Sequence, residues 1–414
     1  MRCSTHPATS APPPRPPPTR RPKGEMSAIP LHPTRIERLT AWLGEARLDC
    51  AVVFGADHVN HLAGYSRYFG GPAAVVVGDD GSRTLVVALD EAPIATEISS
   101  ADEVVPYGVR GFGLDLDPLG SLIPVVAGLD VVATSHRIGV ASELPGAEER
   151  FALAAASAEL ASAAGALARI RLRKDADELE RIAAAYGLCW TAQAAVAEAS
   201  VPGATEIGIF SAGEAAATLA AGTPIEFVGD LLSGPNAAEV CGPIRIPGTR
   251  PVAAGEGVVA DLVARLNGYW GDTAETHPVS GAPEVVAARE ALYGILKATA
   301  AKLVPGATGR DLFAELNACI RETFPGGEFP HHGGHGVGLG SFEDPHVIPA
   351  DETPLEAGMV LAIEPGVYFP GRYGARVEEI FVVTEGGGVE LREAFAGSGL
   401  PARPDLDPSR SVDA

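Results

Sequence analysis

Residues 257–273 read Gly257-Val-Val-Ala-Asp261-Leu-Val-Ala-Arg-Leu-Asn267-Gly268-Tyr-Trp-Gly-Asp272-Thr273. Two apolar runs flank Asn267-Gly268, a dipeptide that favours the tight turn of a β-hairpin because both residues tolerate positive φ. A two-residue turn here would pair Val263 with Asp272. Since side chains two residues apart share one face of a strand, Asp261 and Asp272 would then be diagonal neighbours on the same face.

Each aspartate taken alone is most simply interpreted as a turn-stabilising or salt-bridged residue. Asp261, however, follows the apolar run Val258-Val259-Ala260, where an ionised carboxylate is costly unless it is paired or bound to a metal. Three other short segments carry comparable groups. They are Pro330-His331-His332-Gly333-Gly334-His335-Gly336-Val337-Gly338, Leu361-Ala362-Ile363-Glu364-Pro365-Gly366 and Ala375-Arg376-Val377-Glu378-Glu379.

These three segments would each be an ordinary polar loop or strand edge if they stood alone. Glycine on both sides of His335 lets neighbouring backbone approach closely and leaves the imidazole uncrowded. Glu364 ends an apolar strand that is stopped by Pro-Gly. Strand alternation puts Arg376 and Glu378 on one face and Glu379 on the other, and a buried Glu378 would need a cation nearby.

Together the segments supply four carboxylates and one imidazole. Such an oxygen-rich set suits divalent ions such as Mn²⁺, Fe²⁺ or Co²⁺ better than the metals that prefer thiolates. Two ions about 3.5–4 Å apart need bridging carboxylates, which five protein groups can supply. The five candidate ligands are Asp261, Asp272, His335, Glu364 and Glu378.

The order Asp-(x10)-Asp, Gly-His-Gly, Glu-Pro-Gly and Arg-Val-Glu resembles the pita-bread metallopeptidase family, which includes aminopeptidase P, prolidase, methionine aminopeptidase and the metal-free creatinase. The resemblance extends from about Arg35 to Arg392. In the N-terminal half, Asp49-Cys-Ala-Val-Val53 and Asn60-His-Leu-Ala-Gly-Tyr65 resemble the creatinase-type domain, and Ser233-Gly-Pro-Asn236 matches a loop of many members.

The resemblance implies a role for each candidate ligand. Asp261 would hold one metal, and Asp272 and Glu378 would bridge both. His335 and Glu364 would complete the second site. The implied cofactor is a pair of divalent ions, with manganese expected first and iron, cobalt or zinc as alternatives.

The resemblance also implies catalytic roles for three residues. Glu364 would be the general base toward a water molecule that the two cations acidify. His331 matches a histidine that contacts substrate. Arg376 matches an arginine beside the last ligand, where it would orient carboxylates.

Three positions depart from the family pattern. Cys241 and Phe342 stand where members carry histidines that hold substrate, and a phenyl ring cannot perform that task. Glu275 stands where many relatives have arginine. Four neighbouring residues are candidates to substitute for the missing imidazoles: Glu343, Asp344, His277 and His332.

The leading hypothesis is therefore a dinuclear-metal hydrolase that cleaves a peptide or amide C–N bond in a small substrate, in the manner of Xaa-Pro dipeptidases and aminopeptidases. A second hypothesis keeps the metals but assigns a specialised reaction, either C–N hydrolysis or elimination on a small metabolite. A third is an inactive binding module, which four clustered carboxylates without metal disfavour because they would repel one another. Family members are often dimers, so we expect a homodimer.

Composition narrows the partners and the compartment. The 414 residues carry a formal charge of −22, which argues against nucleic acid or an anionic membrane as a partner. No uninterrupted apolar run reaches the roughly eighteen residues that span a bilayer. Five scattered cysteines with no Cys-x-x-Cys pair fit reduced thiols and a cytoplasmic location.

The predicted fold class is α+β, a pita-bread catalytic domain preceded by a smaller mixed α/β creatinase-type domain. We expect a disordered proline-rich extension over 1–33, the N-terminal domain over 34–172, the catalytic domain over 173–400 and a disordered tail over 401–414. Residues 1–25 hold eight prolines and are predominantly basic, which favours disorder or polyproline structure. They are a docking site, a tail without a role, or a segment before a true first residue at Met26.

Hydrophobic periodicity predicts the elements. Strands are expected at 50–54, 73–77, 84–88 and 129–132 in the first domain, and at 225–231, 257–271, 359–363, 376–384 and 387–392 in the second. A helix is expected from Asp175, whose side chain and Glu178 form a capping box. Further helices are expected after Thr205, at 283–303 and at 309–323.

Overall fold

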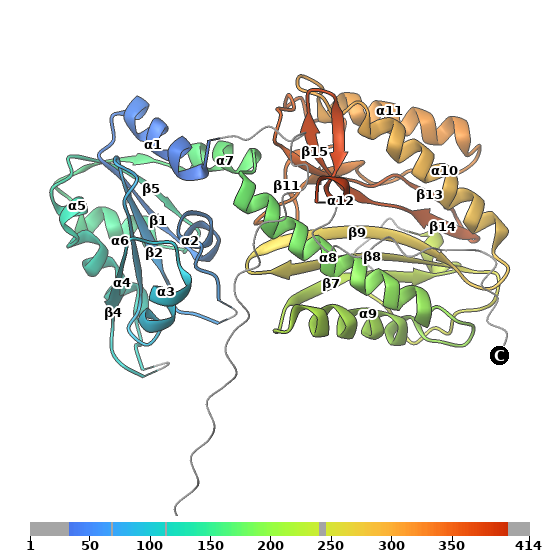
Figure 1. Ribbon diagram of the computed structural model, residues 1–414, viewed down its shortest axis with the longest axis horizontal. Coiled ribbons are helices and arrows are strands. Elements are labelled where there is room, and N and C mark those ends of the chain that lie inside the picture. The colour runs from blue at the N-terminus through green and yellow to red at the C-terminus, as the bar shows by residue number, and fades with distance from the viewer. Residues whose placement is uncertain (1–32, 68, 112–113, 240–245, 396–414) are drawn as a thin grey trace, which may run out of the picture.

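The computed structural model describes residues 33–67, 69–111, 114–239 and 246–395. Figure 1 shows two lobes connected by α7 (Ala164–Leu172) and the start of the long helix α8 (Ala176–Ala199), which continues along the C-terminal lobe. The proline-rich segment and the C-terminal tail lie outside the described residues. None of the helices in the described ranges is both long enough and apolar enough to cross a bilayer.

The N-terminal lobe is built on a six-stranded mixed sheet in the order β4-β3-β2-β1-β5-β6. The central strand β1 is antiparallel to β2 and parallel to β5. The strands expected at 50–54, 73–77 and 84–88 are confirmed. The six strands are β1 (Cys50–Phe54), β2 (Ala74–Gly78), β3 (Arg83–Ala88), β4 (Glu103–Tyr107), β5 (Arg137–Ser142) and β6 (Glu159–Ser162).

Helices cover both faces of this sheet, because its two faces pack into separate apolar clusters. The first helix begins with a capping box between Thr34 and Glu37 and buries Leu39 and Leu43. The helices are α1 (Arg35–Ala46), α2 (Ala56–Ala63), α3 (Ala92–Ile98), α4 (Pro118–Ala127), α5 (Asp130–Ala133), α6 (Ala147–Ala154) and α7.

The strand expected at 129–132 is wrong. Residues Asp130–Ala133 form the short helix α5, in which the hydroxyl of Thr134 donates to the carbonyl of Asp130 at 2.7 Å. Only Val132 is buried within it. The segment Leu129-Asp130-Val131-Val132 has three apolar residues among four, which fit one turn of helix as well as a strand, so the pattern alone could not separate the two.

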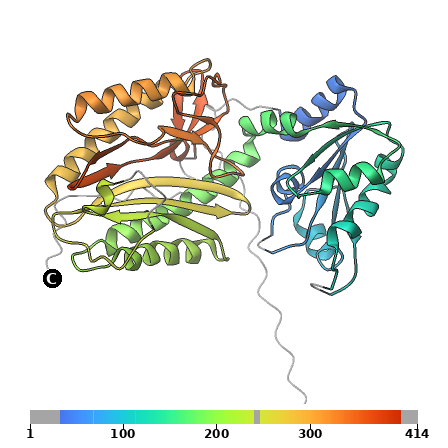
Figure 2. The same ribbon diagram turned by 180° about the vertical axis from the view of Figure 1, so that it is seen from behind.

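The C-terminal lobe contains antiparallel sheets and long helices, which confirms the α+β class. Helices α8 and α9 lie along the β7-β8-β9 sheet, whereas α10 and α11 lie over the other sheet (Figures 1 and 2). The second sheet has the order β11-β10-β12-β15-β16. The strands are β7 (Glu226–Ser233), β8 (Gly257–Leu266), β9 (Tyr269–Pro278), β10 (Gly334–Gly336), β11 (Glu343–His346), β12 (Val360–Ile363), β13 (Gly366–Phe369), β14 (Tyr373–Arg376), β15 (Glu379–Thr384) and β16 (Gly387–Glu390).

The helices of this lobe agree closely with the sequence pattern. Those expected at 283–303 and 309–323 are α10 (Pro283–Ala300) and α11 (Gly309–Thr323). Thr205 caps α9 (Glu206–Ala221), since its side chain accepts from the amide of Gly208. Two short helical turns complete the lobe, η2 (Asn236–Ala238) and α12 (Leu391–Ala394).

The hairpin of β8 and β9 has the predicted register. Leu266 pairs with Tyr269, and Val263 pairs with Asp272. Asn267 and Gly268 adopt φ of 49° and 83°, which is what the tight turn requires. Asp261 and Asp272 are therefore diagonal neighbours, as expected.

The single strand expected at 376–384 is wrong, because the chain is interrupted between β14 and β15. The amide of Val377 donates to the carbonyl of Pro365 at 3.2 Å, and the amide of Glu378 donates to that of Ala274 at 2.8 Å. These two bonds tie successive residues to different segments, so the strand cannot continue through them. Arg376 still faces the acidic cluster, while Glu379 contacts Tyr186 on the other side.

A buried polar junction joins the two lobes at the start of α8. Asp175 caps the helix, and its carboxylate accepts from Arg35 of α1 at 2.8 Å. The carboxylate of Glu178 lies 3.3 Å from His61 Nε2 and accepts from the hydroxyl of Tyr269 at 3.2 Å. Burial alone would raise the pKa of Glu178, but His61 and Arg35 outweigh it and lower that pKa to about 2.

We predict that Glu178→Gln removes an acid-sensitive part of the stability. Since the pKa of Glu178 falls from 4.5 to about 2 on folding, its ionised form contributes about 3 kcal/mol that is fully present above pH 4.5 and is lost as the pH falls toward 2. The free energy of unfolding, from urea titrations at several pH values, should be lower in the variant at pH 7 and depend less on pH below 4.5.

The matched control is Glu180→Gln, because Glu180 lies on the same helix but is exposed. This control should follow the wild-type curve at every pH. Equal pH dependence of Glu178→Gln and the wild type would refute the assignment.

Candidate metal centre

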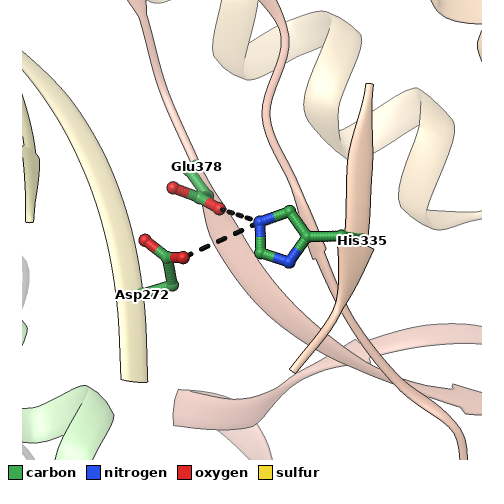
Figure 3. A group of neighbouring side chains, drawn as sticks. All are labelled: Asp272, His335 and Glu378. Atoms are coloured by element: carbon green, nitrogen blue, oxygen red, sulfur yellow. Dashed lines mark ion pairs between the residues drawn. The ribbon is translucent and has the colours of Figure 1, made fainter. Parts of the chain in front are cut away.

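Strands β9 and β10 and the ends of β12, β14 and β15 carry four of the candidate ligands. Asp272 lies on β9 and His335 on β10. Glu364 directly follows β12, and Glu378 occupies the interruption between β14 and β15. Figure 3 shows Asp272, His335 and Glu378 pointing toward one another from these separate segments.

Ligand atoms of Asp272, His335 and Glu378 all lie within 4.8 Å of one another. The Nε2 atom of His335 is 3.7 Å from Asp272 Oδ2 and 3.9 Å from Glu378 Oε1. It is also 3.7 Å from Glu364 Oε1. Because metal–ligand bonds are roughly 2 Å long, such separations are those of groups that can share one small cation.

Glycines on both sides of His335 allow this approach, as the sequence predicted. A Cβ on Gly334 would stand 2.0 Å from the carbonyl oxygen of Ala362, and one on Gly336 would stand 2.3 Å from that of Asp344. The strand β10 therefore fits between β11 and β12 only without these side chains. The Nδ1 atom of His335 lies 3.0 Å from the carbonyl oxygen of Gly336, which accepts its proton and turns Nε2 toward the carboxylates.

The buried carboxylates lack the partners that buried charges require. Both oxygens of Glu378 and Oδ1 of Asp272 have no hydrogen-bond partner among the described residues. Burial, together with the neighbouring carboxylates, raises the pKa of Asp272 and of Glu378 well above the usual range. Clustered acids of this kind are stabilised by a cation between them, so the residues present fit the divalent ions that the sequence implied.

Asp261 is held differently from the other candidates. Arg376 binds its Oδ2, and Asp261 is not one of the three residues that converge on one point. Burial first, and then the nearby Glu364 and Asp230, raise the pKa of Asp261 to about 6. Asp261 remains part of the acidic cluster, but its nearest charge in the structure is the guanidinium of Arg376.

Sequence reasoning missed Asp230, which pairs with Asp261 across β7 and β8. Its Oδ1 is buried and has no partner among the described residues. Burial raises the pKa of Asp230, although Arg376 opposes that rise. The sequence did contain a signal that could have identified Asp230: an acidic residue between Gly229 and Leu231, within a segment predicted to be a strand.

Glu364 lies between the cluster and two further histidines. Its Oε1 is 3.0 Å from His332 Nδ1, and its Oε2 is 3.7 Å from His331 Nδ1. Burial alone would raise the pKa of Glu364, but His332 and His331 lower it to about 2. Burial also lowers the pKa of His331 to about 3.

A tyrosine that the sequence did not single out connects His331 with Arg376. The hydroxyl of Tyr368 lies 3.0 Å from His331 Nε2 and accepts from Arg376 Nε at 2.9 Å. Arg376 in turn binds Asp261. The three residues predicted to be catalytic, Glu364, His331 and Arg376, thus border the same acidic cluster.

The departures from the family pattern have different outcomes. Glu275 is fully buried and accepts from Arg289 Nε at 2.6 Å and from the hydroxyl of Tyr293 at 2.7 Å, so an arginine on α10 neutralises it. The phenyl ring of Phe342 packs on His335 with ring centres 4.5 Å apart. Cys241 lies outside the described residues.

Two family models match this chain. Residues 180–385 match metallopeptidase family M24, and residues 35–173 match the creatinase/prolidase N-terminal domain. The probable dipeptidase PepE of Mycobacterium tuberculosis is 33% identical over 280 residues, which cover 66% of this chain and 72% of that protein. The Xaa-Pro dipeptidase of Pyrococcus furiosus is 35% identical over 153 residues, covering 36% and 43% of the two chains.

Solved structures agree over most of the molecule. The dipeptidase PepE from Mycobacterium ulcerans superposes with a TM-score of 0.67 at 28% identity, covering 86% of this chain and 94% of that one. The prolidase from Pyrococcus furiosus gives a TM-score of 0.67 at 26% identity, covering 85% and 98%. The chain therefore has the pita-bread fold with a creatinase-type N-terminal domain, belongs to metallopeptidase family M24 and is a metal-dependent hydrolase.

Proposed function

We propose that this protein is a dinuclear-metal peptidase that cleaves small Xaa-Pro substrates as a dipeptidase or aminopeptidase. The observation that carries the proposal is the convergence of three buried carboxylates on His335 Nε2 at 3.7–3.9 Å, of which Asp272 and Glu378 have oxygens without a hydrogen-bond partner among the described residues. Relatives named dipeptidase and Xaa-Pro dipeptidase support the substrate class. The proposed ligands are Asp261, Asp272, His335, Glu364 and Glu378.

Two divalent cations, with manganese proposed first because the set is rich in hard oxygens, would supply Lewis acidity toward a carbonyl and acidify a water molecule. The residues around them position the reactants. Glu364 is the proposed proton acceptor, since its carboxylate borders the cluster and no arginine engages it among the described contacts. Arg376 holds the carboxylate of Asp261 in place, and His331 is oriented by Tyr368.

A specialised C–N hydrolysis or elimination is the second candidate. The exposed phenyl ring of Phe342 favours it, since this position carries a histidine in the family that the sequence resembles. An inactive binding module is disfavoured by the cost of burying several carboxylates without a counter-charge. Phe342 in place of a substrate-binding histidine does not alter the clustered carboxylates. Both enzymatic hypotheses therefore retain the metals.

Organisation and location are proposed on separate grounds. We place the domain boundaries at 34–172 and 173–400, supported by the edges of the two matched regions and by the junction of α7 with α8. A cytoplasmic location is supported by the free thiols of Cys50, Cys189 and Cys319.

We also propose that the protein is a homodimer. Light scattering at micromolar concentration tests this proposal, and a monomer would refute it.

We predict that Asp272→Asn abolishes metal binding together with activity. The wild type should contain two equivalents of metal per chain by elemental analysis, and metal should raise its melting temperature because only the folded state binds it. The variant should lose at least about 10²-fold in kcat/KM, since it lacks one of the residues that would hold the metal. Asp79→Asn, at an exposed turn, is the control and should match the wild type.

The metal-free variant supplies a second measurement. In chelator, Asp272→Asn should melt no lower than the wild type, because it removes one of several clustered negative charges. A lower melting temperature without metal would instead identify Asp272 as a structural residue, and full metal occupancy in the variant would refute its assignment as a ligand.

We predict that the manganese-loaded protein releases proline from Xaa-Pro dipeptides such as Ala-Pro and much less product from Ala-Ala. Amino-acid analysis after incubation measures both products. Asp272→Asn, treated identically, should release neither. Absence of proline release at any metal loading, with turnover of N-substituted amino acids, would reject the peptidase proposal in favour of the second candidate.

A further inference from the structure

Phe342 creates an apolar wall at the edge of the acidic cluster. The residue is 51% exposed. The centre of its ring lies 4.5 Å from the ring centre of His335, 4.9 Å from that of His332 and 4.6 Å from that of His346. A phenyl ring neither donates nor accepts a conventional hydrogen bond. Any polar contact to a substrate on this side must therefore come from a neighbour.

Two acidic neighbours are already engaged elsewhere. Glu343 binds Arg171 and lies 3.4 Å from Lys174. Burial alone would raise the pKa of Glu343, but Lys174 and Arg171 outweigh it and leave that pKa lowered. Asp344 is 74% exposed and pairs with His346 at 3.1 Å. Both carboxylates are thus engaged in ion pairs with other residues.

His277 is also excluded. Its side chain is 1% exposed, and its Nε2 lies 2.8 Å from the side-chain oxygen of Gln193. Gln193 itself is bound to the carbonyl of Ala260 within the core. A histidine enclosed in this way does not meet anything that enters from solvent.

His332 differs from all three. Its Nδ1 lies 3.0 Å from Glu364 Oε1, and the ring of Phe342 packs against it edge to face at 76°. Its side chain is 29% exposed, whereas those of His335 and Glu364 are 5% exposed. Among the described residues that contact Glu364, His332 is therefore the one most open to solvent.

The orientation of the ring leaves one nitrogen for an incoming group. Glu364 engages Nδ1, and no described contact engages Nε2. The ring centres of Phe342, His335 and His331 lie 4.9, 5.5 and 5.9 Å from that of His332, and these neighbouring rings limit how far the imidazole can turn. The side chain is thus held beside the cluster with Nε2 available.

We propose that His332 is a second substrate-contacting imidazole of this site, beside His331, and that the ring of Phe342 holds it next to Glu364. This inference rests on the proposed function. The group that His332 would contact is the polar group next to the scissile C–N bond of a small dipeptide substrate. His332 would thereby make the polar contact to the substrate that the phenyl ring of Phe342 cannot make. The cations themselves remain held by the other residues of the cluster.

The test compares His332→Ala with the double variant His332→Ala/Phe342→His. His332→Ala should lose about 10²-fold in kcat/KM on Ala-Pro while it keeps two equivalents of metal and the full metal-induced rise in melting temperature. The double variant places an imidazole at position 342, whose side chain packs against position 332, and should recover at least about tenfold in kcat/KM. His346→Ala, which removes another ring packed on Phe342 but has no contact with Glu364, should remain within about twofold of the wild type.

Binding is measured independently of turnover. Calorimetric titration with an Ala-Pro analogue whose scissile carbonyl is replaced by a methylene group should show about tenfold weaker binding in His332→Ala. Loss of metal in that variant would make His332 a ligand or a structural residue and overturn the proposal. Unchanged kcat/KM and unchanged analogue affinity would also overturn it.

The two proposals fail in distinguishable ways. If the metal-loaded wild type releases no proline, the Xaa-Pro function is rejected and the His332 assignment is decided by the analogue titration alone. Weaker analogue binding in His332→Ala would then support the contact, and equal binding would reject it. If the wild type does release proline, His332→Ala must lower both kcat/KM and the affinity for the analogue for the assignment to stand.

Discussion

The electrostatic cost of burying several carboxylates around one histidine governs the C-terminal lobe. Asp272 and Glu378 are 5% and 1% exposed, and both have oxygens without a partner among the described residues. Like charges in a low-dielectric interior repel strongly, and hydrogen bonding within the chain does not relieve them here. The fold brings these groups together because their strands pack against one another, so a bound cation is what reconciles the packing with the charge.

The surrounding residues control where the remaining charge lies. Arg376 binds Asp261, while His331 and His332 lie beside Glu364, so these two carboxylates meet different counter-groups. Tyr368 connects two of these contacts through one hydroxyl. This division keeps the acids distinct from one another, which is the condition for giving one of them a role in proton transfer and the others roles in binding cations.

Departures from the family pattern illustrate two kinds of compensation. At Glu275 the charge is reversed relative to many relatives, and Arg289 on a different element supplies the complementary cation. At Phe342 a polar group is absent, and the partly exposed imidazole of His332, on the loop before β10, packs against the phenyl ring. The first preserves the packing between β9 and α10, whereas the second changes which atoms line the site.

The sequence by itself determined the parts that depend on local chemistry. Asn267-Gly268 sets the register of the hairpin, and the spacing of apolar residues sets α10 and α11, because turns and amphipathic helices are encoded within short windows. Tertiary structure alone decided that Asp130–Ala133 is a helix, that the chain breaks before Glu378, and that Arg376 binds Asp261. The last two features depend on hydrogen bonds and charges between segments that are distant in the chain, and no local pattern records them. At Asp130–Ala133 the local pattern fits a helical turn and a strand alike, so it could not decide between them.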